Sequence, residues 1–467
     1  MRSVKGIRLA GVFLLGGLSF FLGANAQENS PFSRYGLGDL YPGQNIATRG
    51  MGGISAAYSN EQALNTLNPA SYSSLRFINV MGNSRGGMVS YDLGLTIDSR
   101  NLMRAKPAEN FRSVNFVPAY ITLGVPLSAK AAARKRDVGL VFGLRPYTKI
   151  NYSVESLQKT PIDSIESLYE GSGGLNQVFV GLGKRWNNLS LGLNVGYDFG
   201  KKDISTKTIF HNDTVLYYKS DQNVNTAFWG LFINPGFTYN IKLNEVAGKN
   251  NSYKDVYFLK LGASATLKRS LDASMSTTVS TFNYDPNTGT FPIDTVYFNK
   301  DQKGNIDIPL TYTAGFMFSK KYAVGDLATA TKWAFGADYT VGKWSEYRFY
   351  GQPDQVNDSW MIHAGTEFVP SLLSTNFWSR STYRVGAYAG KDYINADGNG
   401  YNVKAVTLGF GFNVRRWTSY DNQSTFINTA FEFGKRGTDV NNISENFFKF
   451  SVGLSLADLW FTKQKYD

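Results

Sequence analysis

The chain has 467 residues, with 33 Phe, 28 Tyr, 8 Trp, 47 Gly and no cysteine, and its formal charge is +12. The absence of cysteine excludes a disulfide scaffold and thiolate chemistry. The basic balance suits anionic lipid head groups or an acidic partner. Nucleic acid is not expected as a partner, because the Lys and Arg residues are scattered through loop-like segments.

The N-terminus has the pattern of a secretory signal peptide. Three cations precede a short apolar run, Leu9–Leu22, which leads into a small-residue cleavage site at Ala24–Ala26. The run is too short for a lasting transmembrane helix, and no later stretch approaches the roughly 18 apolar residues that a spanning helix needs. We therefore expect residues 1–26 to be removed and the mature chain to begin at Gln27.

Residues 27–76 differ from the rest of the chain. They lack alternation and are dense in small residues, as in Thr48–Gly53, Ala56–Ser59 and Ala63–Ala70. This composition favours a compact element packed inside another structure. From residue 77 to residue 461 the pattern changes to one of repeated strands.

The strand signal is a period of two in which one parity is apolar, as transmembrane β-strands require over about 9–11 residues. In 189–199 the odd positions are Leu, Val, Tyr or Phe, whereas the even positions are Ser, Gly, Asn or Asp. The same alternation recurs in 404–414 and in 448–456, where a closing strand is expected. Any single segment would also suit a half-buried soluble strand, so the interpretation depends on their number.

Sixteen segments carry this signal, of which about 14 are expected to be barrel strands: 87–97, 114–127, 137–152, 174–186, 188–207, 225–240, 254–268, 270–284, 305–320, 331–342, 344–351, 358–369, 381–391, 402–416, 421–435 and 446–457. Polar segments at 153–173, 241–253 and 285–304 are expected to be extracellular loops, and Asn187 a tight turn. The fold class is therefore all-β, an antiparallel transmembrane barrel.

The layout resembles that of the FadL family of outer-membrane long-chain fatty-acid transporters, whose relatives carry aromatic hydrocarbons. The specific part of the resemblance is Thr48–Leu75, with the triplet Asn68, Pro69 and Ala70 just before the first strand. The resemblance implies a 14-stranded barrel with an N-terminal lumenal hatch at 27–76. It also implies a kink in the third strand, which opens a side gap for an apolar ligand.

Pro146 is the candidate for that kink, because proline lacks the N–H that a central strand donates to its ladder. The alternative is that it only ends a strand or sits in a bulge. If the hatch docks at this strand, the Asn68–Ala70 triplet packs beside Pro146. Phe116 and Tyr120 share the interior parity of their strand and are the expected apolar ligand contacts.

The sequence offers little for catalysis. It has two histidines, His211 and His363, and neither a metal-spaced cluster nor a Gly-x-Ser-x-Gly elbow. By parity His363 and Glu367 face the lumen, where a hydrogen-bonded wall pair is the simpler interpretation. We therefore expect no enzyme activity, no metal and no cofactor.

Two functions of different classes remain. The first is a passive outer-membrane channel, in a Gram-negative cell, for hydrophobic small molecules such as fatty acids. The second is a non-transporting barrel subunit of a larger outer-membrane machine, either a protein-secretion translocon or a barrel-assembly complex; the polar loops and the periplasmic tail 462–467 favour it. Expected partners are outer-membrane lipids and lipopolysaccharide, a hydrophobic small molecule, and other outer-membrane proteins under the second function.

Overall fold

The computed structural model describes residues 30–75, 77–80, 84–104, 108–127, 138–159, 163–211, 218–247, 253–285, 289–324, 327–371, 374–398, 400–415, 423–437, 441 and 443–460. The expected signal peptide 1–26 and tail 462–467 lie outside the described residues. Among the described residues, no helix is long and apolar enough to cross a membrane.

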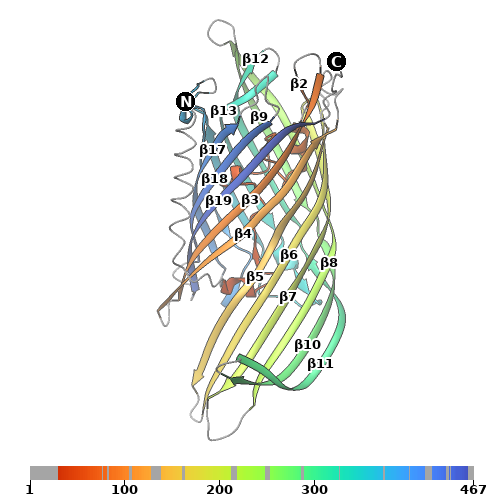
Figure 1. Ribbon diagram of the computed structural model, residues 1–467, viewed down its shortest axis with the longest axis vertical. Coiled ribbons are helices and arrows are strands. Elements are labelled where there is room, and N and C mark those ends of the chain that lie inside the picture. The colour runs from red at the N-terminus through yellow and green to blue at the C-terminus, as the bar shows by residue number, and fades with distance from the viewer. Residues whose placement is uncertain are drawn as a thin grey trace.

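Fourteen strands pair in antiparallel order and close on themselves, because the last strand pairs with the first from Ile443↔Arg104 to Trp460↔Gly87. The predicted barrel and its strand number are therefore confirmed (Figure 1). In ring order the strands are β3 (Ser84–Arg104), β4 (Glu109–Pro126), β5 (Val138–Lys159), β6 (Ser164–Trp186), β7 (Leu189–Phe210), β8 (Lys219–Ala247), β9 (Lys254–Thr266), β12 (Thr311–Val324), β13 (Leu327–Gly342), β15 (Ser359–Phe368), β16 (Thr382–Lys391), β17 (Asn402–Arg415), β18 (Gln423–Arg436) and β19 (Ile443–Trp460).

The other described elements are short or lie outside the ring. Strands β10 (Arg269–Asp285) and β11 (Gly289–Ile308) form a hairpin on β8, and β14 (Arg348–Phe349) adds to β11. Strand β2 (Phe77–Val80) pairs with β3, and β1 (Asp39–Leu40) with β5. The helical turns are η1 (Pro31–Arg34), α2 (Ile46–Arg49), η2 (Pro69–Ser74), η5 (Trp344–Glu346), η6 (Trp378–Arg380) and η7 (Ala396–Gly398).

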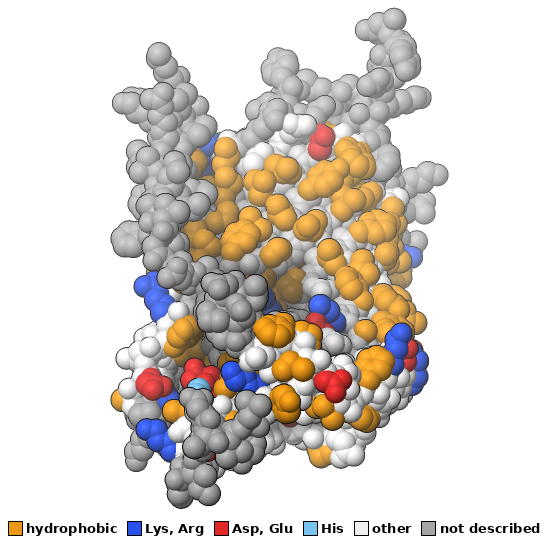
Figure 2. All heavy atoms as spheres, turned by 60° about the horizontal axis from the view of Figure 1, so that its bottom comes forward, with side chains coloured by type: hydrophobic (Ala, Val, Ile, Leu, Met, Phe, Trp, Pro, Cys, Tyr) orange, Lys and Arg blue, Asp and Glu red, His pale blue; other side chains and the backbone are white. Residues whose placement is uncertain are grey.

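Side-chain burial follows the parity read from the sequence. In β7 the odd residues from Leu189 to Phe199 are 37–46% exposed, whereas Asn194 and Asp198 are fully buried. The apolar set therefore faces outward, as lipid requires, and the polar set faces inward. Figure 2 shows apolar side chains spread over the barrel wall, with mixed charges at the end nearest the viewer.

The expected loops at 153–173 and 285–304 are mostly strand. Strands β5 to β8, together with β10 and β11, continue past the closed ring as an arm at the end of the molecule opposite the C-terminus (Figure 1). Beyond the membrane both faces of a sheet meet water, so the apolar period that marks a spanning strand is lost. The expected strand at 344–351 is also wrong, since those residues form η5 and β14.

Residues 30–75 lie within the ring and contact strands all round it. The segment lies so close to several inward glycines of the wall that a Cβ added to any of them would overlap it: Gly139, Gly183, Gly192, Gly236, Gly262, Gly365, Gly386 and Gly409. In several cases the overlap is with backbone, as between Gly365 and the carbonyl of Met51. The segment is thus packed against the wall backbone to backbone, at the density of a protein core.

Adding one methyl group at this contact is expected to destabilise the protein. Gly365→Ala or Gly386→Ala places a Cβ against rigid backbone, so we expect a loss of about 1–3 kcal/mol in unfolding free energy. Urea titration of the detergent-solubilised protein measures it. Ala389→Val, which adds bulk at an exposed position of β16, is the control; an equal loss there would refute a special role for the glycine contact.

Candidate functional site

The barrel wall is interrupted between its second and third strands. Pairing of β4 with β5 stops at Ile121↔Leu144, although both strands run on beyond this point. Pro146 follows directly, at a register shift in the β5–β6 ladder. The freed edge of β5 is taken by β1, where Asp39 and Leu40 pair with Lys149 and Thr148. The N-terminal segment thus replaces part of the missing neighbour strand.

An outward-facing groove of about 940 Å³ lies at this interruption. Its lining is largely apolar and comes from the five strands β4 to β8. Phe116, Tyr120 and Pro146 all line it, together with the exposed side chains of Ile121, Leu144, Tyr197 and Phe199. The sequence therefore identified three residues that the fold brings together.

The expectation that Phe116 faces the lumen is wrong. Phe116 is 63% exposed, whereas Tyr120 is 6% exposed. The β3–β4 ladder shifts register so that Ala119 is an extra residue, and this bulge reverses the parity of the strand. Tyr120 points inward, where its hydroxyl accepts a hydrogen bond from the N–H of Ile46 at 3.1 Å.

The Asn68–Ala70 triplet does not pack beside Pro146. The Asn68 side chain caps η2 and donates to the carbonyl of Phe237 in β8 at 3.1 Å. Pro69 and Ala70 pack against Gly192 of β7. The residues of the segment nearest Pro146 include Tyr41, whose N–H donates to the carbonyl of Tyr147 at 2.9 Å, and Thr66, whose hydroxyl accepts from Arg145 at 3.0 Å.

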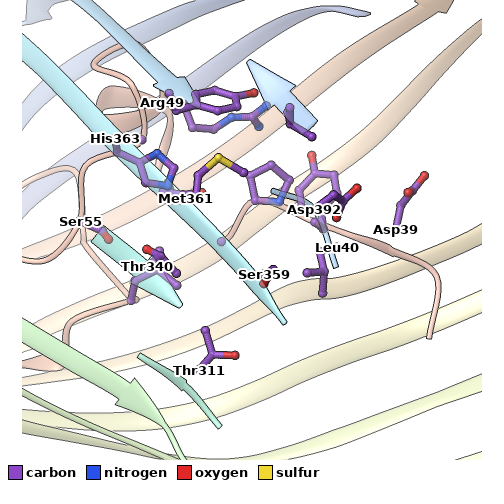
Figure 3. Close-up of a pocket in the computed structure, with 18 of the residues that line it drawn as sticks. Asp39, Leu40, Arg49, Ser55, Thr311, Thr340, Ser359, Met361, His363 and Asp392 are labelled. Carbon is purple, nitrogen blue, oxygen red and sulfur yellow. The ribbon is translucent and has the colours of Figure 1, made fainter. Parts of the chain in front are cut away.

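A second cavity, of about 340 Å³, lies inside the lumen between the N-terminal segment and the wall (Figure 3). One side of it carries hydroxyl and amide groups from β8, β9, β12, β13 and β15: Asn234, Ser264, Thr266, Thr311, Thr313, Thr340 and Ser359. The other side carries charged residues. Apolar side chains such as Leu40, Trp344 and Met361 also line the cavity, so its lining is of mixed character.

The two lumenal residues weighed for catalysis do not form a pair. A ring nitrogen of His363, Nδ1, lies 2.6 Å from the carbonyl oxygen of Gly52, and Glu367 accepts from Arg384 at 3.3 Å. Each side chain thus has a partner of its own. His363 serves to hold the N-terminal segment against β15.

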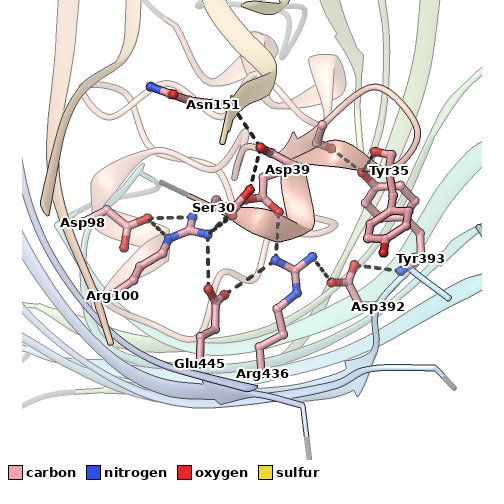
Figure 4. Close-up of polar contacts among 12 residues, drawn as sticks. Ser30, Tyr35, Asp39, Asp98, Arg100, Asn151, Asp392, Tyr393, Arg436 and Glu445 are labelled. Atoms are coloured by element: carbon pink, nitrogen blue, oxygen red, sulfur yellow. Dashed lines mark hydrogen bonds and ion pairs between the residues drawn. The ribbon is translucent and has the colours of Figure 1, made fainter. Parts of the chain in front are cut away.

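Buried charges tie the N-terminal segment to the strands that close the barrel (Figure 4). Asp39 accepts from Arg100 of β3 at 3.0 Å and from Arg436 of β18 at 2.8 Å. Arg436 also pairs with Asp392, and Glu445 of β19 lies 3.6 Å from both arginines. A separate pair joins Arg49 to Glu432 at 2.6 Å, with both side chains almost fully buried.

Asp39 lies outside the spanning strands and is ionised. Although burial opposes its charge, the guanidinium groups of Arg436 and Arg100 hold the pKa of its carboxyl group well below the usual range. The sequence analysis missed this network. Its only signal was charge at inward parity, as at Glu432 and Arg436, and parity alone does not say which inward residues meet.

Removing one member of the Arg49–Glu432 pair is expected to be costly, whereas removing both is not. Arg49→Met leaves a buried carboxylate alone, so we expect a loss of about 3–5 kcal/mol, recovered in large part by Arg49→Met with Glu432→Leu. Urea midpoints in detergent report both values.

The exposed pair Lys343–Asp358, at 3.0 Å, provides the control. Lys343→Met there should leave the urea midpoint almost unchanged, because solvent screens an exposed pair. If the double variant at Arg49 and Glu432 is as unstable as Arg49→Met, the loss does not come from an unpaired charge.

Solved structures similar to this chain include two bacterial toluene transporters and a FadL homologue. The Pseudomonas putida toluene transporter TodX is 14% identical and aligns over 90% of this chain and 99% of its own, with a TM-score of 0.51. The Ralstonia pickettii toluene transporter TbuX is 13% identical, over 90% of this chain and 98% of its own, with a TM-score of 0.48. A Pseudomonas aeruginosa FadL homologue is 11% identical, over 91% and 99%, with a TM-score of 0.49. The FadL-like fold expected from the sequence is confirmed.

A search of curated proteins returns no significant match. The family model of BamG, by contrast, matches residues 7–467, which is nearly the whole chain. A match of that extent is decisive for the family, and this chain belongs to the BamG family.

Proposed function

We propose that this protein is a non-transporting barrel subunit of a larger outer-membrane assembly. The observation that carries the proposal is the packing of residues 30–75 across the lumen, against inward glycines and through buried ion pairs. Of the two machines considered from the sequence, the family name BamG favours the barrel-assembly complex over the secretion translocon.

The energy needed to clear the lumen supports this proposal over transport through it. Displacing the segment breaks the Arg49–Glu432 pair and the bonds of Asp39, and it separates the segment from the wall glycines against which it is packed. A passive channel has no energy source to meet such a cost.

The N-terminal part of the segment is also anchored by apolar packing on the arm side of the barrel. Phe32 and Leu37 join a buried apolar cluster with Trp344, Tyr347 and Tyr393 from the connections at that end of the barrel. The rings of Trp344 and Tyr393 are 4.6 Å apart, and the Tyr393 hydroxyl donates to the carbonyl of Gly38. The segment is therefore held on the arm side by apolar packing as well as by charge.

The groove at Pro146 favours a second candidate function, a channel that passes a hydrophobic small molecule sideways into the bilayer. Its apolar lining and its position at the interrupted wall suit such a ligand. Fatty acids and aromatic hydrocarbons belong to this class. The packing of residues 30–75 in the lumen behind the groove makes this the weaker of the two candidates.

Isolation of the native protein distinguishes the two. We expect the chain, tagged in its own cells and extracted with mild detergent, to migrate as a stoichiometric complex with other outer-membrane proteins. Depletion of the chain should then impair assembly of other outer-membrane proteins before it affects uptake of any hydrophobic compound.

The channel function would replace this proposal under a different result. In that case the chain is isolated alone, it binds a fluorescent fatty acid, and Leu144→Asp in the groove abolishes the binding, because an unpaired charge opposes an apolar ligand. Leu408→Asp, on the outward face of the distant strand β17, controls for general damage to the barrel.

A further inference from the structure

The groove at Pro146 has a charged end as well as an apolar wall. Lys149 of β5 and Lys201 of β7 line it together with exposed aromatic side chains, and none of the described residues that line it is Asp or Glu. Both lysines pair in register with Gly174 of β6, so they lie at one level and on the same face of the sheet. We call Lys149 and Lys201 the groove lysines.

The space between the groove lysines is open. Gly174 has no side chain there, and a Cβ on it would lie 2.4 Å from the carbonyl oxygen of Thr148. Strands that are two apart in a sheet are separated by roughly 9–10 Å, so the two ammonium groups border one shared space. Lys201 is 68% exposed and pairs with Asp203 at 2.7 Å. An exposed ion pair of this kind contributes little, so it does not keep the ammonium group from a stronger anion.

The groove lysines lie at the head-group level of the outer leaflet. Phe199 is the last apolar residue of the outward set in β7, and it pairs with Trp229 of β8, which also lines the groove. Aromatic rings favour the boundary between hydrocarbon and head groups, and Lys201 follows two residues later. The tight turn at Asn187 joins β6 and β7 at the other end of the barrel. Because outer-membrane barrels have short periplasmic turns, the end with the lysines is extracellular.

We propose that the groove holds one phosphorylated glycolipid of the outer leaflet, the lipid A part of lipopolysaccharide. An acyl chain lies along the apolar wall, and a phosphate group lies between Lys149 and Lys201. The inference goes beyond the proposed function and does not rest on it. A lipid that stays bound is compatible with a barrel that transports nothing.

The position and charge of the groove together select this occupant. Water does not fill an apolar groove that faces hydrocarbon, and an empty groove would forfeit the dispersion contacts of its wall. An acyl chain meets both conditions. The groove lysines add a preference for a chain whose head group is anionic, because each cation near the membrane surface attracts such head groups. An aromatic hydrocarbon has no group for them to bind.

Native mass spectrometry of the detergent-solubilised protein tests the site. The probes are purified lipid A, the same lipid A after enzymatic removal of its phosphates, and phosphatidylglycerol. We expect one lipid A to be retained, and Lys149→Gln with Lys201→Gln to weaken its binding at least tenfold, because two cationic contacts to phosphate are lost. Lys303→Gln is the matched control. Lys303 lies at the same level of the sheet, through Ala227 and Ser274, but it does not line the groove.

Arginine at both positions should keep the binding, since it preserves the charge, and heat-modifiable migration on gels shows whether each variant has a folded barrel. Equal binding of lipid A to the glutamine variant would overturn the inference, as would equal binding of lipid A without phosphates. Phosphatidylglycerol bound as tightly as lipid A would also overturn it, because the groove would then accept any anionic lipid. None of these results changes which proteins are isolated with the chain, so this inference and the proposed function fail separately.

Discussion

The close contact between the wall glycines and residues 30–75 is the constraint on which the rest of the structure depends. A barrel of fourteen strands encloses a lumen too wide for its own inward side chains to fill. Here the inward positions at one level are often glycine, and the space is taken by a segment that is itself rich in small residues. The barrel wall and the segment therefore pack together as a single core.

The filled lumen also determines how the inward charged side chains are paired. Once the segment occupies the lumen, any inward charge near it is removed from water and must have a partner. Asp39 is the partner of Arg100 and Arg436, and Glu432 is the partner of Arg49. Because these partners are on β3 and β18, the segment also joins the first strand of the barrel to strands near its end. A buried network of this kind holds one arrangement well, and it tolerates the loss of single members poorly.

The interruption at Pro146 depends on the same segment. A spanning strand with an unpaired edge leaves backbone groups without partners in the bilayer, which is costly. In this protein β1 pairs with part of the free edge of β5. The segment that fills the lumen therefore also covers the edge of the interrupted wall. An open side gap would require β1 to leave, and β1 carries Asp39. The apolar groove is thus coupled to the buried charged contacts of Asp39, which supports the structural role proposed above.

The sequence by itself determined the barrel, its strand number and, in regular strands such as β7, which residues face lipid, because a period of two with an apolar parity is a local property of each strand. It also identified Pro146 as a break in strand pairing, because proline lacks a backbone N–H whatever its surroundings. Tertiary structure alone decided the orientation of Phe116, because the bulge at Ala119 arises from pairing with β3. It also decided the extended arm, whose strands carry no apolar period, and the location of the Asn68–Ala70 triplet against β7 and β8. The Asp39 network likewise joins residues up to 397 positions apart, and no local pattern encodes a contact between segments so distant in the chain.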